Sequence, residues 1–175
     1  MKTKGTHNKW KENKPDTAIG SYRIKNKALL LLPPLIAAFV SCTKIQGTIE
    51  STGDALGAWT LAPDKCMTGD RERIVGAALY AKKDPNVWVK ISRDMRNQLL
   101  ITVAIPSTCK KDGTCQALLI DRSRCSALSG DVRLTNVMTP DDFHHADGFL
   151  SMDCAVSIGA KKSRIKGEVR FTNCD

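Results

Sequence analysis

The chain is poor in the residues that metal sites and many hydrolases use. It has three histidines in 175 residues, and the only two beyond residue 41 are the neighbours His144 and His145. No Cys-x-x-Cys pair occurs, and the closest cysteines, Cys109 and Cys115, are separated by Lys-Lys-Asp-Gly-Thr, which argues against zinc. His-Glu-x-x-His, a calcium EF-hand loop and Gly-x-Ser-x-Gly are also absent. We therefore expect no cofactor and no enzymatic activity.

The chain also lacks an apolar run long enough to span a membrane as a helix. Residues 28–40 carry no charge, but a span needs about 17 to 25 apolar residues, and Pro33 and Pro34 interrupt the run. Arg23, Lys25 and Lys27 precede it. A basic cluster before a short apolar segment is the layout of an export signal, so residues 1–41 are predicted to be a signal peptide.

The excess of positive charge belongs mainly to this leader. The formal net charge is +9, and eight Lys or Arg against two acidic residues give residues 1–41 a net +6. The remaining part carries +3, which is ordinary for a globular domain. Nucleic acid is therefore not an expected partner.

The apolar run ends in Phe39-Val40-Ser41-Cys42, which resembles the lipobox of bacterial lipoproteins, with Phe where Leu is usual. The resemblance implies that the Cys42 thiol receives a diacylglycerol and becomes the acylated N-terminus, carrying palmitate-type chains. More than one chain makes a lasting membrane anchor. Thr43 is not the Asp that commonly signals inner-membrane retention in this family, which favours the outer membrane. The alternative is cleavage without lipidation, which leaves an odd thiol.

Without Cys42, six cysteines remain, and an even number in an exported chain predicts three disulfides. Cys109 and Cys115 flank an Asp-Gly turn and can meet locally. A hairpin turn near residues 160–161 would place Cys154 opposite Gly167 and far from Cys174. The register of the strands then pairs Cys125 with Cys154 and leaves Cys66 for Cys174.

The part after Cys42 predicts a short tether followed by an all-β domain. Residues 42–57 are small, polar and glycine-bearing, which is typical of a flexible linker. Residues 58–175 contain short β-branched segments separated by turn residues, which predicts an antiparallel β-sandwich or small barrel of about seven to eight strands stapled by disulfides. The expected strands cover residues 74–81, 87–92, 99–105, 116–121, 132–137, 149–157 and 164–171.

The same part resembles small cysteine-bearing bacterial lipoproteins of unassigned function. The pattern that carries the resemblance is Cys66-Met-Thr-Gly69, Cys125, Leu150-Ser-Met-Asp-Cys154 and Phe171-Thr-Asn-Cys174. It implies a shared disulfide β fold and supplies no activity.

One polar segment, residues 139–148, offers metal-capable side chains. Imidazoles and carboxylates within one loop could gather on a transition metal if the backbone aims them inward; the candidates are Asp141, Asp142, His144, His145 and Asp147. The alternative is a solvated connection between strands.

Two functions follow from these patterns. The first is a lipid-anchored envelope protein, a non-enzymatic module that binds an envelope protein or glycan. The second is a metal-binding or hydrolytic envelope protein that uses the Asp141–Asp147 loop.

Overall fold

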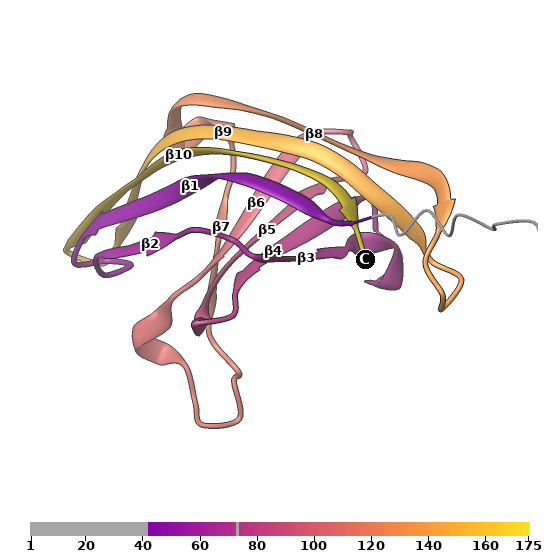
Figure 1. Ribbon diagram of the computed structural model, residues 1–175. Helices are drawn as coiled ribbons and strands as arrows, with labels where there is room; N and C mark the ends of the chain where they lie inside the picture. The colour runs from indigo at the N-terminus through magenta and orange to yellow at the C-terminus, as the bar shows by residue number, and fades with distance from the viewer. Residues whose placement is uncertain (1–41, 73) are drawn as a thin grey trace, which may run out of the picture. The chain divides into compact units, whose positions relative to one another are not determined.

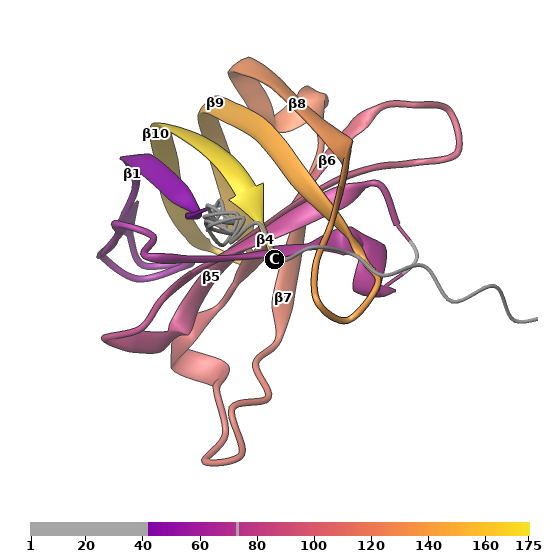
Figure 2. The same cartoon turned by 45° about the vertical axis from the view of Figure 1, so that its right-hand side comes forward.

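The computed structural model describes residues 42–72 and 74–175, so the predicted signal peptide lies outside the described residues. The domain is all-β, as predicted, and its two open antiparallel sheets of five strands make it a sandwich (Figures 1 and 2). The described part has ten strands, more than the seven or eight expected: β1 Lys44–Gly53, β2 Trp59–Leu61, β3 Lys65–Thr68, β4 Gly76–Ala81, β5 Asp84–Arg93, β6 Leu99–Ala104, β7 Ala117–Ile120, β8 Cys125–Met138, β9 His144–Ile158 and β10 Lys161–Cys174. Three short 3-10 segments also occur in it: η1 Gly69–Glu72, η2 Pro106–Thr108 and η3 Arg122–Arg124.

The chain builds the two sheets in three stages. A β1–β2 hairpin starts sheet A, the meander β3-β4-β5-β6-β7 forms sheet B, and β8, β9 and β10 return to sheet A. The order in sheet A is β2-β1-β10-β9-β8, so the first strand and the last strand of the domain lie side by side. Sheet A arches over sheet B, and the β6–β7 connection extends away from both (Figure 1).

The prediction of a flexible tether over residues 42–57 was wrong, because residues 44–53 form β1 and pair with β10 along their whole length. Two of the glycines that suggested a flexible linker lie within this strand pairing. A Cβ on Gly47, whose φ is +103°, would lie 2.0 Å from the carbonyl oxygen of Glu168. Glycine therefore allows two strands to approach closely here. The β domain begins at Lys44, not at residue 58.

The core fills the space between the inner faces of the sheets. The alternation that predicted the last two strands is confirmed, since every second residue of β9 from Leu150 to Val156 is buried. Sheet B contributes Leu79, Val89, Ile91, Ile101 and Val103, all fully buried. Each such side chain contributes about 1.5 to 3 kcal/mol relative to an exposed one.

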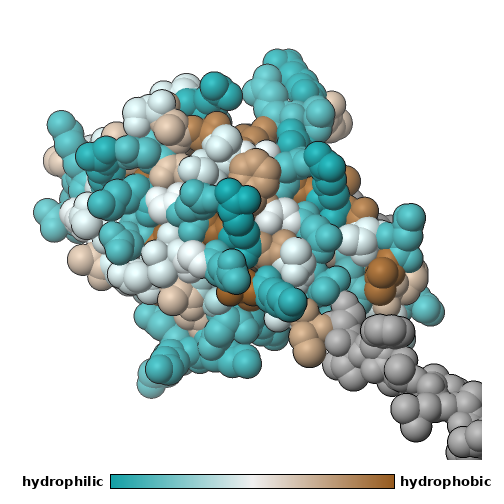
Figure 3. Space-filling view, turned by 45° about the horizontal axis from the view of Figure 1, so that its top comes forward, coloured by the Kyte–Doolittle hydropathy of each residue, from teal (hydrophilic) through white to brown (hydrophobic). Residues whose placement is uncertain are grey.

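The outer face of sheet A is largely hydrophilic (Figure 3). It carries ion pairs between neighbouring side chains, with Arg164 Nε 2.7 Å from Asp153 Oδ1 and Arg170 2.9 Å from Glu168. The hydrogen bond from Arg164 holds the pKa of Asp153 below its usual range. This face is therefore a solvated surface.

Three disulfides tie the strands together, in the predicted pairs. Cys66–Cys174 joins β3 of sheet B to β10 of sheet A, Cys125–Cys154 links β8 to β9, and Cys109–Cys115 closes the β6–β7 connection. The predicted register of the last hairpin was wrong by two residues. Cys154 lies opposite Ile165, because the turn is the two-residue Gly159–Ala160.

Candidate functional site

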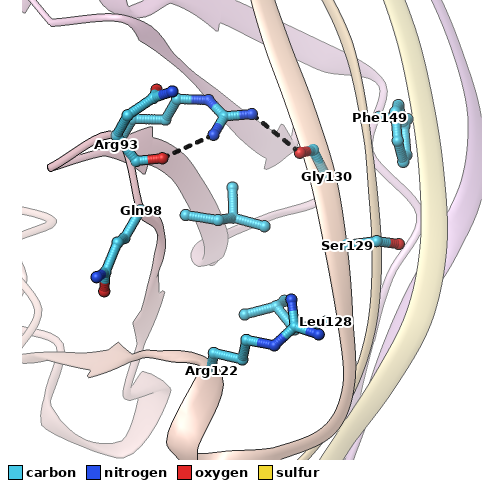
Figure 4. Close-up of a pocket in the computed structure, with 9 residues that line it drawn as sticks. Arg93, Gln98, Arg122, Leu128, Ser129, Gly130 and Phe149 are labelled. Atoms are coloured by element: carbon cyan, nitrogen blue, oxygen red, sulfur yellow. Dashed lines mark hydrogen bonds between the residues drawn. The ribbon is translucent and has the colours of Figure 1, made fainter.

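A cleft of about 580 Å³ lies at the edge of sheet A, where β8 approaches the β5–β6 turn of sheet B (Figure 4). Its walls come from β5, the β5–β6 turn, β6, η3, β8 and β9, and the residues that line it are Arg93, Asn97, Gln98, Leu99, Arg122, Leu128, Ser129, Gly130 and Phe149. Two arginines and the apolar side chains of Leu99 and Leu128 thus face the same space, whereas Phe149 lies on the other side of β8 (Figure 4).

Arg93, the last residue of β5, forms one wall and is held by three acceptors. Its guanidinium donates to the Asn97 carbonyl at 2.9 Å, to the Gly130 carbonyl at 3.3 Å and to Asp131 Oδ1 at 2.9 Å. The turn that carries Asn97 is fixed by Asp94 Oδ1, which accepts from the backbone N–H groups of Arg96 and Gln98 at 2.8 Å each. Arg93 therefore fastens the turn of sheet B to the edge strand of sheet A.

Asp131 is the negative partner that keeps this wall in place. It accepts from Arg133 Nε at 2.6 Å on its second oxygen. Hydrogen bonds from Arg133, and then from Arg93, hold the pKa of Asp131 below its usual range. The carboxylate is therefore ionised at neutral pH and is already engaged by protein groups.

Arg122 forms the opposite wall and lies beside Leu128 (Figure 4). It is the first residue of η3, and Asp121 caps that segment by accepting from the Ser123 N–H at 2.9 Å. The Arg122 side chain is exposed and, within the described residues, makes no hydrogen bond or ion pair. It is the cation of the cleft that is free to meet a ligand.

The lining combines basic, neutral polar and apolar side chains. Among the described residues that line the cleft there is no carboxylate and no imidazole. A guanidinium offers planar, fork-shaped recognition of a carboxylate or phosphate, and Leu99 and Leu128 supply apolar contact. Together these side chains could contact an anionic group and an apolar group at the same time.

Sequence reasoning missed this cleft, because it joins residues that are far apart in the chain. Arg93 and Asp131 are 38 positions apart. The turn signal of Asp94 and Asn97 was readable, but the approach of β8 was not.

Cys42 is exposed and is the one cysteine of the described residues outside a disulfide. Asn173 Nδ2 donates to its carbonyl at 3.4 Å, and Thr43 Oγ1 donates to the Asn173 carbonyl at 2.7 Å. The residue therefore lies beside the C-terminal end of β10. Within the described residues, no helix is long and apolar enough to cross a membrane.

No family model, curated protein or solved structure matches this chain. The resemblance to bacterial lipoproteins therefore stays a prediction.

The expected loop over residues 139–148 was wrong in its second half, because β9 begins at His144. Neighbouring residues of a strand point to opposite faces, so the two imidazoles diverge. His145 is buried, with Nδ1 3.1 Å from the Cys174 carbonyl and 3.2 Å from Asp175 Oδ1. His144 Nδ1 lies 2.9 Å from the Thr135 carbonyl.

The carboxylates of this segment are equally dispersed. Asp141 pairs with Arg71 at 3.1 Å, and Asp147 Oδ1 accepts from the Asn173 N–H at 2.8 Å. Asp142 occupies the tight β8–β9 turn with φ of +64°. Across the described residues, no group of three or more His, Cys, Asp or Glu side chains is placed to hold a metal ion.

Proposed function

We propose that this protein is a lipoprotein of the bacterial cell envelope, anchored through acylated Cys42, and that it acts as a non-enzymatic binding module. The position of Cys42 carries the proposal. It is exposed, it is outside every disulfide of the described residues, and it stands two residues before the first strand of the domain. An acylated N-terminus at this position leaves the whole fold intact. Residue 43 is Thr and not the Asp that commonly signals inner-membrane retention in bacterial lipoproteins, which favours the outer membrane.

The disulfides support an exported location. Such bridges form and persist in oxidising compartments such as the periplasm and are rare in the cytosol. The three bridges use all six of the remaining cysteines, so within the described residues Cys42 is the one thiol available for acylation.

The cleft supports the binding part of the proposal. With Arg93 held by Asp131, Arg122 supplies the charge that a partner would meet. We take the partner to be an envelope glycan or protein that presents an anionic group.

The anchor is tested by replacing Cys42. Native protein should partition into the detergent phase and incorporate labelled fatty acid. The Cys42→Ser protein should lose both properties, whereas a matched Thr43→Ser protein keeps them. Unchanged detergent partitioning of Cys42→Ser would refute the anchor.

The cleft is tested by two arginines of the same 3-10 segment. Arg122 lines the cleft and Arg124 does not, although both are exposed. In a pull-down from native envelopes, Arg122→Ala should lose the captured partner and Arg124→Ala should retain it. Equal capture by both variants contradicts a binding role for the cleft.

A further inference from the structure

We propose that one corner of the domain lies directly in the head-group layer of an anionic bilayer, an inference that rests on the proposed acylation of Cys42. This anchor corner consists of residues from the start of the domain, from β3 and from the β4–β5 hairpin: Thr43, Lys65, Met67, Tyr80, Lys82 and Pro85.

A single residue separates the proposed anchor from the sheet. β1 begins at Lys44 and pairs there with Thr172, so only Thr43 separates the anchored residue from the sheet. At about 3.3 Å per residue, the strand begins within about 7 Å of Cys42. The head-group layer of one leaflet is about 5 to 8 Å thick. Side chains beside Cys42 must therefore enter or touch that layer.

The fold also brings β3 close to Thr43, the residue after the proposed anchor. The Cys66–Cys174 bridge ties β3 to the end of β10, and the Thr68 N–H donates to the Asp175 carbonyl at 2.6 Å. A hollow of about 600 Å³ is lined by Thr43 together with Lys65, Met67 and Lys82. A neighbouring hollow of about 280 Å³ shares the last three and adds Tyr80 and Pro85.

The side chains of the anchor corner are of types that suit a membrane interface. Tyrosine is enriched at membrane interfaces, and lysine can lay its apolar stem along the surface while its ammonium reaches lipid phosphates. Lys65 and Lys82 are exposed, and within the described residues their side chains have no hydrogen-bond or ion-pair partner.

The larger hollow also carries other charged groups. Arg71 pairs with Asp141 at 3.1 Å, whereas the carboxylates of Asp64 and Asp175 accept from the backbone N–H of Lys82 at 2.8 Å and lie 3.2 Å from His145 Nδ1, respectively. Within the described residues, Lys65 and Lys82 are the cations of this lining whose side chains have no partner and can meet lipid phosphates.

Lysine labelling of the acylated wild-type protein tests this proposal without any substitution. A membrane-impermeant amine reagent is applied to protein on phosphatidylglycerol vesicles, on phosphatidylcholine vesicles, in detergent and in native envelopes, and modification is read by mass spectrometry. Lys161 and Lys162 are internal references, because they begin β10 at the end opposite Cys174. A basic side chain near an anionic surface gains about 1 kcal/mol, so we expect the reactivity of Lys65 and Lys82 to fall about fivefold on anionic vesicles.

Four outcomes are distinguished. Protection of Lys65 and Lys82 with unchanged Lys161 and Lys162, stronger on anionic than on zwitterionic vesicles, supports the proposal. Unchanged reactivity in protein shown by mass to be acylated overturns the corner and leaves the anchor standing, whereas absence of acylation refutes the proposed function itself. Protection that appears in native envelopes but not on pure lipid also overturns the proposal and indicates a protein partner.

Discussion

The three disulfides should differ in their contribution to stability, in an order set by the lengths of the loops that they close. The bridges span 108, 29 and 6 residues for Cys66–Cys174, Cys125–Cys154 and Cys109–Cys115. Loop-closure entropy of the unfolded chain then gives about 4.8, about 3.6 and about 2.2 kcal/mol respectively. The two shorter bridges shorten the longest loop, which lowers its value by about 0.3 kcal/mol.

Burial of the cysteines is expected to give the same order of stability losses as loop length. Cys174 and Cys154 have no exposed surface, whereas Cys109 and Cys115 are partly exposed. Replacing a pair by alanines therefore leaves the larger void at the two bridges of the core.

Equilibrium unfolding in urea measures this order. In each variant, both cysteines of one bridge are replaced by alanine. The free energy of unfolding is then compared with that of the parent protein, with the same dependence on urea concentration (m-value) used for both. Loss of Cys66–Cys174 should cost most and loss of Cys109–Cys115 least. If the Cys109 and Cys115 pair costs as much as the Cys66 and Cys174 pair, the loop-entropy reasoning is refuted.

Three further predictions concern single residues. Gly47→Ala should destabilise the domain by more than about 1 kcal/mol in thermal melts, because the new Cβ meets a backbone carbonyl, whereas Gly57→Ala, which has nothing within 4 Å, should cost less; equal losses contradict the close-approach argument. Ser163→Ala should cost about 1 to 3 kcal/mol, because the buried hydroxyl accepts from two backbone N–H groups at 3.0 Å each; an unchanged melting temperature refutes this account. Because the pKa of Asp131 is lowered on folding, its stabilisation is complete above the unfolded value of about 3.9 and is lost as the pH falls through the folded value. Asp131→Asn should therefore lower the melting temperature at neutral pH, by about 1 kcal/mol of stability, and this difference should shrink below about pH 4; a difference independent of pH contradicts the ion-pair account.

Alternation made the strands from β4 onward predictable. From Leu150 to Val156 and from Ile165 to Phe171, large apolar residues recur at every second position except Gly167. This pattern survives folding because one face of each strand is buried. The cysteine pairing could be predicted for the same reason, since antiparallel pairing of β8 with β9 brings Cys125 opposite Cys154.

The strands before β4 could not be predicted, because their residues also fit a linker or loop when the partner strands are unknown. In β1, Gly47 and Gly53 read as linker residues until the partner strand is present. The histidine pair illustrates the opposite error. A run of Asp and His resembles a loop, but β8 pairs Met138 with His144 and β10 pairs Cys174 with Ala146, so both histidines belong to β9.

The candidate site could also be predicted only in part. The prediction that Cys42 is the anchored residue came from the local sequence before it, and the structure adds that β1 begins two residues later. The cleft between Arg93 and Arg122 depends on where β8 passes the β5–β6 turn, and no local pattern records that distance.

The central claim is that the mature protein begins at an acylated Cys42, and intact-mass analysis of the protein from its native membrane tests it most directly. The account predicts a chain that starts at Cys42, carries a diacylglycerol with or without a further acyl chain, and lacks six hydrogens through its three disulfides. A mass that matches an unmodified Cys42, or a chain that begins at another residue, contradicts the account.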